Sequence, residues 1–177
     1  MLNRLIICFI LVLFSSSLNA QSLLDAMPRT MKAVDFKLPT ASGGEISLHE
    51  LKGKFVLVNF WSTKCTICRS ELTTLQVLYD EFKDDNILEI VTIHAGADLD
   101  GVVELLEISP VSYPMAMDVD LTMGHWGIPS LPTSYLLTPE GNFAYRAVGS
   151  RLWNSPTMID YLRNIIADYE KYKSAEE

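Results

Sequence analysis

The feature that most constrains this chain is an apolar run followed at once by two closely spaced cysteines and a helical pattern. The run at Phe55–Phe60, apolar except for Asn59, is typical of a central strand covered on both faces of a sheet. Cys65 and Cys68 come next, and large apolar residues then recur at helical spacing as far as Phe82, which predicts a helix of about five turns. A Cys-x-x-Cys pair is therefore expected at a strand-to-helix junction.

This position predicts redox chemistry. Unpaired backbone N–H groups and the helix dipole at a helix N-terminus favour the thiolate of Cys65, which is the reactive form of a cysteine. Cys68 lies one helical turn further on, so the two thiols can close a disulfide and open it reversibly. The alternative is half of a zinc site, which needs two more Cys or His ligands. His49, His94 and His125 show no ligand spacing, so we predict no metal.

The first 20 residues resemble a secretory signal peptide. Arg4 precedes the unbroken apolar stretch Leu5–Phe14, and Ser15–Ala20 is a small, polar segment that ends in alanine. The alternative is an uncleaved membrane anchor, but about ten apolar residues fall short of the roughly 20 that span a bilayer. We therefore expect residues 1–20 to be a leader, residues 21–177 to be one domain, and the protein to be exported to the periplasm.

Removing the leader changes the arithmetic of cysteine and charge. Of the three cysteines, Cys8 lies in the leader, so only Cys65 and Cys68 remain, and the protein is not a disulfide-stapled scaffold. Arg4 is the only charged residue of the leader, so its loss takes the net charge from −8 to −9. Nucleic acid and anionic lipid surfaces are poor partners for such a chain. The remaining 157 residues suffice for one domain with its own core, which we expect to be a monomer.

Beyond the first helix, strand and helix patterns continue to alternate, as in an α/β domain. Gln21–Lys32 shows no strong period and is expected to be a mobile lead-in. The remaining predicted elements are a short strand at Val34–Leu38, a connection at Ser47–Lys54, a buried strand at Ile87–Ile93, a helix at Leu99–Ile108, an extended piece at Tyr113–Met117, an irregular Gly- and Pro-rich stretch at Gly124–Thr133, a hairpin formed by Ser134–Leu137 and Phe143–Val148, and a last helix from Pro156.

Two segments in order resemble a known family. Val58–Leu72 is similar to the strand, active-site and helix segment of the thioredoxin-fold TlpA/ResA/CcmG type of exported thiol:disulfide oxidoreductase. Leu131–Leu137, followed by Pro139–Gly141, is similar to the cis-proline loop and terminal hairpin of that family. The resemblance covers about Ala33–Tyr169 and implies a thioredoxin-like α/β fold, in which helices flank a central mixed β-sheet, with an N-terminal extension and a helical insertion.

The resemblance also implies roles for particular residues. Cys65 would attack the client disulfide, and Cys68 would be the buried thiol that resolves the mixed disulfide. Pro132 would be a cis-proline facing the dithiol, turning the backbone of Leu131 toward an extended client segment. The alternative for Pro132 is an ordinary trans loop proline.

Further candidates surround the dithiol. Glu71 would lie close to it, raise the pKa of the thiols and relay protons; the alternative is a solvated helix residue. Asn59 is a neutral amide and cannot accept a proton, which leaves Glu71 for that role. Trp61 and Trp126 are expected to flank the client site together with Lys64 and Leu131, although aromatic residues more often simply pack.

The leading function is a reductase that donates electrons to client disulfides, for example in cytochrome c maturation, and is re-reduced by a membrane thiol carrier. We expect no cofactor other than the Cys65–Cys68 disulfide. An oxidase or isomerase would use the same residues with a different reduction potential. A third possibility is a copper-handling protein that uses the cysteines with Met115, Met117 and Met123, although these methionines are also suited to packing. Peroxidase activity is disfavoured because residues 56–64 lack the proline of a peroxiredoxin peroxide pocket.

Overall fold

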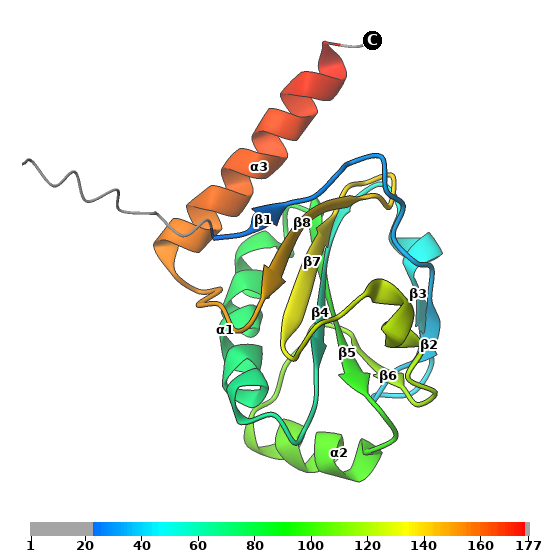
Figure 1. Cartoon of the computed structure of the whole chain (residues 1–177). Coiled ribbons are helices and arrows are strands. Elements are labelled where there is room, and N and C mark those ends of the chain that lie inside the picture. The colour runs from blue at the N-terminus through cyan, green and yellow to red at the C-terminus, as the bar shows by residue number, and fades with distance from the viewer. Residues whose placement is uncertain (1–22, 176–177) are drawn as a thin grey trace, which may run out of the picture.

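The computed structural model describes residues 23–175 as a six-stranded sheet flanked by helices, with a separate two-stranded hairpin (Figure 1). The elements in chain order are β1 (Asp25–Ala26), β2 (Lys37–Pro39), β3 (Glu45–Ser47), the 3₁₀ helix η1 (Leu48–Leu51), β4 (Phe55–Trp61), α1 (Thr66–Phe82), β5 (Leu88–Ala95), α2 (Leu99–Ile108), β6 (Met115–Asp118), the 3₁₀ helix η2 (Thr122–Trp126), β7 (Thr133–Leu137), β8 (Phe143–Val148) and α3 (Pro156–Ser174). The expected leader, residues 1–20, lies outside the described residues.

The main sheet is mixed, as expected. Its order is β1-β8-β7-β4-β5-β6, with β4, β5 and β6 parallel and with β7, β8 and β1 joined by antiparallel pairing. All seven residues of β4 are buried, because this strand is central and covered on both faces. The thioredoxin-like fold with a central mixed sheet is therefore confirmed.

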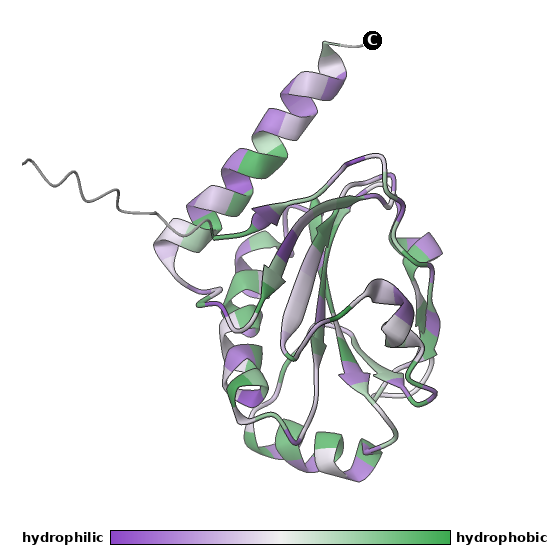
Figure 2. Cartoon of the chain, viewed as in Figure 1, coloured by the Kyte–Doolittle hydropathy of each residue, from purple (hydrophilic) through white to green (hydrophobic). Residues whose placement is uncertain are grey.

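Alternation along the strands divides the core between the two faces of the sheet. One cluster joins Phe55, Leu57 and Trp61 of β4 to apolar side chains of α1 and α3. The other joins Val56, Val58 and Phe60 to the segments around β2, β3, η1 and η2. Hydrophobic residues, coloured green, recur along the strands of the sheet and along the helices beside it (Figure 2). Asn59 lies between Leu57 and Trp61 in the alternation, so it faces α1.

The structure corrects three local expectations. The lead-in contains β1, which pairs with β8, and Leu24 beside it is 3% exposed. The strand predicted at Val34–Leu38 is displaced to Lys37–Pro39, where it pairs with β3. The stretch Gly124–Thr133 overlaps the end of η2, which begins at Thr122. Each difference arises because pairing or burial against distant residues decides short elements that have too few residues to show a period.

α2 has the predicted bounds, and Asp98 caps its N-terminus through the backbone N–H of Gly101. α3 begins at Pro156 behind the capping Ser155, as the proline at a helix start predicts. Within residues 23–175, no helix is both long and apolar enough to cross a membrane.

Candidate active site

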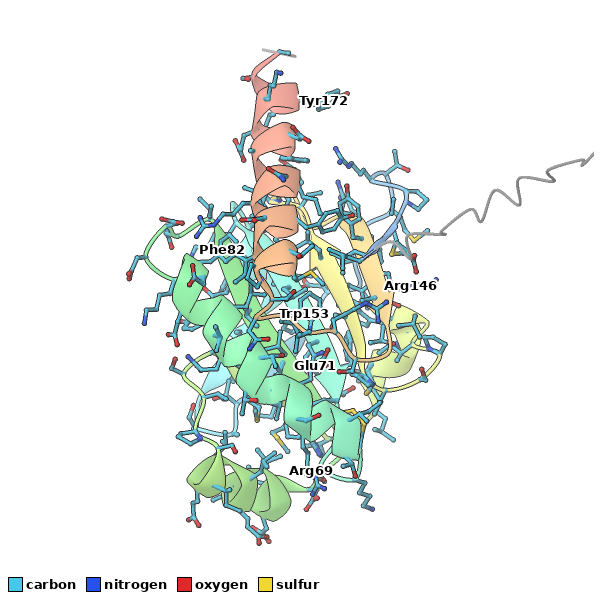
Figure 3. All side chains as sticks on the ribbon, turned by 90° about the vertical axis from the view of Figure 1, so that its left-hand side faces the viewer. Arg69, Glu71, Phe82, Arg146, Trp153 and Tyr172 are labelled. Carbon is cyan, nitrogen blue, oxygen red and sulfur yellow. A yellow bond between two sulfur atoms is a disulfide. The ribbon has the colours of Figure 1, made fainter. Side chains whose placement is uncertain are left out.

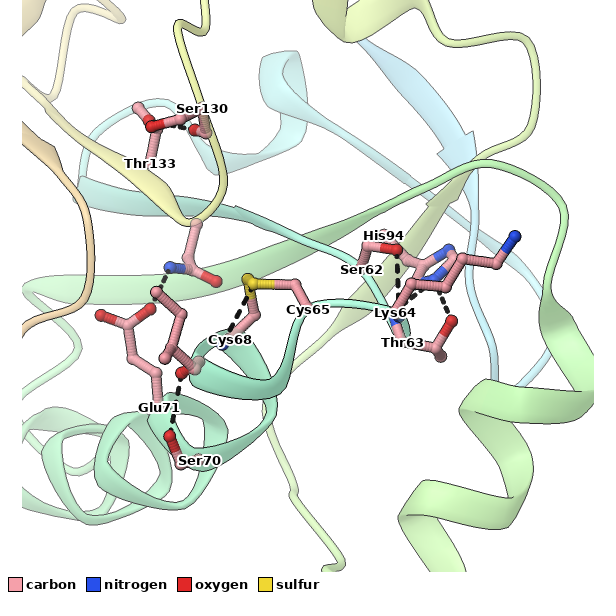
Figure 4. Close-up of a disulfide and its surroundings, with 12 residues drawn as sticks. Ser62, Thr63, Lys64, Cys65, Cys68, Ser70, Glu71, His94, Ser130 and Thr133 are labelled. Carbon is pink, nitrogen blue, oxygen red and sulfur yellow. Dashed lines mark hydrogen bonds between the residues drawn. A yellow bond between two sulfur atoms is a disulfide. The ribbon is translucent and has the colours of Figure 1, made fainter.

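Cys65 and Cys68 form a disulfide at the junction of β4 and α1 (Figure 4). Their sulfurs are 2.04 Å apart and their Cα atoms 5.2 Å apart. Cys65 is the N-cap of α1, and its sulfur accepts a hydrogen bond from the backbone N–H of Cys68 at 3.3 Å. Cys65 is partly exposed whereas Cys68 is 0% exposed, so only the first sulfur is open to another molecule.

The surface around Cys65 combines positive charge and apolar area. Lys64 is exposed directly before Cys65, and α1 has no acidic residue in its first turn. Both features favour a negative sulfur at the helix N-terminus. Ile67, between the two cysteines, is 54% exposed. A hollow of about 190 Å³ lies between Arg69 of α1 and Leu105 of α2 and is also lined by Thr63, two residues before Cys65.

The Pro132 loop lies beside the end of β4. The Leu131–Pro132 peptide bond is cis, and Pro132 is buried. Thr133, the first residue of β7, is paired with Phe60, so the loop precedes β7 at the same edge where the chain leaves β4 for Cys65. Leu131 is partly buried and packs against both core clusters. The backbone N–H of Gly149 donates to the carbonyl of Pro132 at 2.8 Å, which ties the loop to the chain after β8.

Glu71 lies one turn after Cys68 and is 2% exposed, so the alternative of a solvated helix residue is wrong (Figures 3 and 4). Its Oε1 accepts hydrogen bonds from the backbone N–H of Arg151 at 2.7 Å and from Nε1 of Trp153 at 2.6 Å. Its Oε2 accepts one from Nδ2 of Asn59 at 3.2 Å. Loss of hydration on burial raises the pKa of Glu71, and the three donors oppose that rise only in part.

Arg151 and Trp153 were not predicted as site residues. They precede α3, more than 70 positions after Glu71, and no local pattern links them to the cysteines. The path of the chain from β8 to α3 brings them to the carboxylate, and Figure 3 shows Trp153 and Glu71 in the same part of the molecule. Trp153 is 0% exposed, and its buried indole N–H is a signal that can be read only from the folded structure.

His94 contacts the loop before Cys65, which the sequence did not indicate. Its Nε2 accepts a hydrogen bond from the backbone N–H of Thr63 at 3.1 Å, and its Nδ1 lies 3.2 Å from the carbonyl of Gly96. The hydroxyl of Thr63 donates to Asp98 at 2.5 Å. Burial lowers the pKa of His94, which keeps the ring neutral and able to accept. The parallel register that pairs Trp61 with His94 places this histidine next to the loop before Cys65.

The two tryptophans expected at the client surface are buried. Trp61 is 0% exposed and packs edge-on against His94, and Trp126 is 6% exposed in an aromatic cluster with Phe60 and Tyr135. A buried ring cannot contact a client, so the expectation of client binding is corrected in favour of core packing. Lys64, by contrast, is on the surface beside Cys65.

The methionines of the copper alternative do not gather at the cysteines as a group of three. Met115 and Met117 are buried in one core cluster, whereas Met123 packs against the other. Among residues 23–175, no three His, Cys, Asp or Glu side chains form a group that could hold a metal ion.

Comparisons with known proteins agree with this geometry. Residues 30–146 match the model of the AhpC/TSA family. The chain is 31% identical over 135 residues to the thiol-disulfide oxidoreductase ResA of Bacillus subtilis, covering 76% of this chain and 73% of that protein.

Two solved structures from Chlorobium tepidum have similar folds. One is a thioredoxin family thiol:disulfide interchange protein with 27% identity and a TM-score of 0.63, covering 77% of this chain and 97% of the other. The second is described as a putative thiol:disulfide interchange protein DsbE, with 24% identity and a TM-score of 0.68, covering 81% and 98%.

Proposed function

Because the chain belongs to the AhpC/TSA family and is a thiol-disulfide oxidoreductase, we propose that it works outside the cytoplasm as a reductase of client disulfides. The observation that carries this proposal is the unequal exposure of the two sulfurs at the N-terminus of α1. An open attacking sulfur and a buried resolving sulfur are what a two-step exchange requires. The Cys65–Cys68 disulfide is the only redox group that the proposal needs.

The exchange proceeds in two displacements. The Cys65 thiolate attacks one sulfur of the client disulfide, which forms a mixed disulfide and releases the other client sulfur as a thiolate. The Cys68 thiol then loses its proton and attacks the Cys65 sulfur, which releases the second client thiolate and closes the Cys65–Cys68 disulfide. Two electrons pass to the client. Glu71 is suited to accept the proton of Cys68, because burial makes its carboxylate a stronger base.

The client would lie over Cys65 between Lys64 and the Pro132 loop. The backbone of Leu131 would pair with an extended client segment, and Lys64 would attract acidic groups near the client cysteine. The exposed Ile67 offers apolar contact at the same place. This arrangement requires no contact from Trp61 or Trp126.

The proposed location rests on the expected leader at residues 1–20, and the proposed partners rest on the family resemblance. A cleaved signal peptide at residues 1–20 would deliver the protein to the periplasm, where a membrane thiol carrier would re-reduce the Cys65–Cys68 disulfide. Cysteines of cytochromes c awaiting haem attachment are the first client class to test, because the sequence resembles the TlpA/ResA/CcmG type. The alternative of a retained anchor is tested by measuring the mass of the protein isolated from cell fractions. If the leader is removed, this mass corresponds to a chain that begins at Gln21.

A redox titration of residues 21–177 tests the proposed direction. We expect a reduction potential of about −200 mV or lower, in the range of reducing dithiols. A value of about −120 mV, as in strong oxidases, would instead favour the oxidase. The Cys68→Ser variant should accumulate a mixed disulfide between Cys65 and a client such as insulin, whereas Cys65→Ser should not. Equal trapping by both variants would contradict the assigned roles.

A further inference from the structure

A buried acceptor on the strand that precedes the dithiol has no donor in the oxidised protein. Asn59 is 0% exposed, and its Oδ1 makes no hydrogen bond to any residue between 23 and 175. Its Nδ2 is fully used, because it donates to Oε2 of Glu71 at 3.2 Å and lies 2.9 Å from the hydroxyl of Ser134. Burying an acceptor without a partner costs free energy. A state of the protein that supplies a donor to this oxygen is therefore stabilised relative to one that does not.

The orientation of this amide follows from its neighbour. An ionised carboxylate only accepts hydrogen bonds, so the group of Asn59 that faces Glu71 must be the nitrogen. Oε1 of Glu71 is held by Arg151 and Trp153, which prevents the carboxylate from turning away. Oδ1 is consequently kept pointing away from Glu71.

Reduction creates a new buried donor on this side of α1, the thiol of Cys68. Asn59 faces α1, as Leu57 and Trp61 do, and these two residues share a core cluster with Cys68. Cys68 and Glu71 are three residues apart on α1 and both are buried, so they lie on one flank of the helix (Figure 4). In the disulfide, the Cys68 sulfur has no hydrogen to donate. In the dithiol, it carries an S–H group, and a buried thiol keeps its proton.

We propose that Oδ1 of Asn59 accepts a hydrogen bond from the Cys68 thiol when the disulfide is reduced. The bond holds the resolving thiol beside Glu71 and forms only in the reduced protein. It therefore favours the dithiol over the disulfide and makes the reduction potential less negative. This inference rests on the redox cycle of Cys65 and Cys68 proposed above.

The first test is a redox titration of Asn59→Leu, a substitution of similar size that has no acceptor. We expect the equilibrium constant for reduction of the disulfide to fall about tenfold, which is about 30 mV toward more negative potential. Ser134→Ala is the matched control. It removes a partner of the same amide in both redox states, so its effects on the two states cancel. The equilibrium constant for reduction should therefore stay within about twofold of that of the unaltered protein.

A second test needs no substitution at Asn59 and so does not depend on folding of the variant. The ¹³Cγ resonance of Asn59, followed by NMR at mildly alkaline pH, should shift on reduction of the unaltered protein because its carbonyl gains a donor. A third, separate test does use the substitution. In Cys65→Ser, which leaves the Cys68 thiol in place, the infrared S–H stretch should rise in frequency when Asn59→Leu is added.

The outcomes separate the two proposals. An Asn59 resonance that does not respond to reduction, or an Asn59→Leu potential equal to that of Ser134→Ala, would overturn the hydrogen bond while leaving the reductase intact. A Cys65–Cys68 pair that does not titrate at all would overturn the proposed function itself. A shift in potential together with the resonance change would support the inference.

Discussion

Glu71 is a carboxylate enclosed by the protein behind a reactive disulfide. Its two oxygens are in different surroundings, since Oε1 receives two short hydrogen bonds and Oε2 only one longer one. Burial raises the pKa of this group despite the three donors. A base with this property beside Cys68 suits proton removal from the resolving thiol, and the same burial makes its ionised form costly for the fold.

Replacing Glu71 by glutamine should therefore change how stability depends on pH and should also slow client reduction. An acid whose pKa is raised on folding contributes stability that is present below its unfolded value of 4.5 and is lost as the pH rises through the folded pKa. The free energy of unfolding of Glu71→Gln, relative to the unaltered protein, should consequently increase with pH by about 1.4 kcal/mol for each unit by which the pKa is raised.

Client reduction by Glu71→Gln should slow by about 100-fold, as expected on losing a general base. Urea unfolding between acid and neutral pH checks the first effect, and an insulin reduction assay checks the second. Glu107→Gln, an exposed carboxylate on α2, is the control and should change neither. A pH-independent difference in stability would show that Glu71 titrates alike in the folded and unfolded chain.

At the scale of the element, α1 provides the charge environment of the attacking sulfur. Its N-terminus begins at Thr66 behind the capping Cys65, with no carboxylate in the first turn to compete for the dipole. A buried stripe that includes Leu72, Leu75 and Leu78 holds the helix against the sheet. The helix therefore places one sulfur at its exposed end and the other beneath it.

We expect iodoacetamide to alkylate Cys65 before Cys68 in the reduced protein. Cys65 combines access with a thiolate favoured by the helix N-terminus, whereas Cys68 has no exposed surface. Peptide mass mapping after brief labelling over a range of pH identifies the modified residue. In urea the preference should disappear, because it depends on the folded helix. Preferential labelling of Cys68 in the folded protein would contradict the assignment.

At the scale of the whole molecule, the segment before β2 is part of the fold and is connected to the site. β1 pairs with β8, and Nε of Arg151 donates to the carbonyl of Leu23 at 2.9 Å. The backbone N–H of Arg151 holds Glu71 in turn. One residue thus joins the N-terminal segment to the buried carboxylate.

Leu24→Ala should lower the free energy of unfolding by about 2–4 kcal/mol, because Leu24 is 3% exposed and its loss leaves a cavity in the core. Met31→Ala, at a residue that is 48% exposed in the same segment, should change it by less than about 0.5 kcal/mol. Chemical denaturation of both variants measures the difference. Equal, small effects would show that the segment before β2 contributes little to the core.

Elements with local signals could be predicted before the fold was known. The apolar run of β4, the cysteine spacing and the periodic leucines of α1 are each a continuous stretch, so neighbouring residues are enough to predict the strand-to-helix junction. The bounds of α2 and the start of α3 were predicted for the same reason. The cis peptide bond before Pro132 was predicted from the family resemblance. The local sequence alone would have favoured an ordinary trans proline.

The burial of the site residues depends on contacts between segments that are far apart in the sequence. From the sequence, Glu71 could equally have been solvated. In the fold, Trp153 and Arg151, which are distant in sequence, donate hydrogen bonds to it. From the sequence, Trp61 and Trp126 could have lined a client surface. In the fold they are buried, and they pack against His94 and Tyr135, respectively. Burial and hydrogen-bond partners depend on segments far apart in the chain, and a local pattern carries no information about which of them will meet.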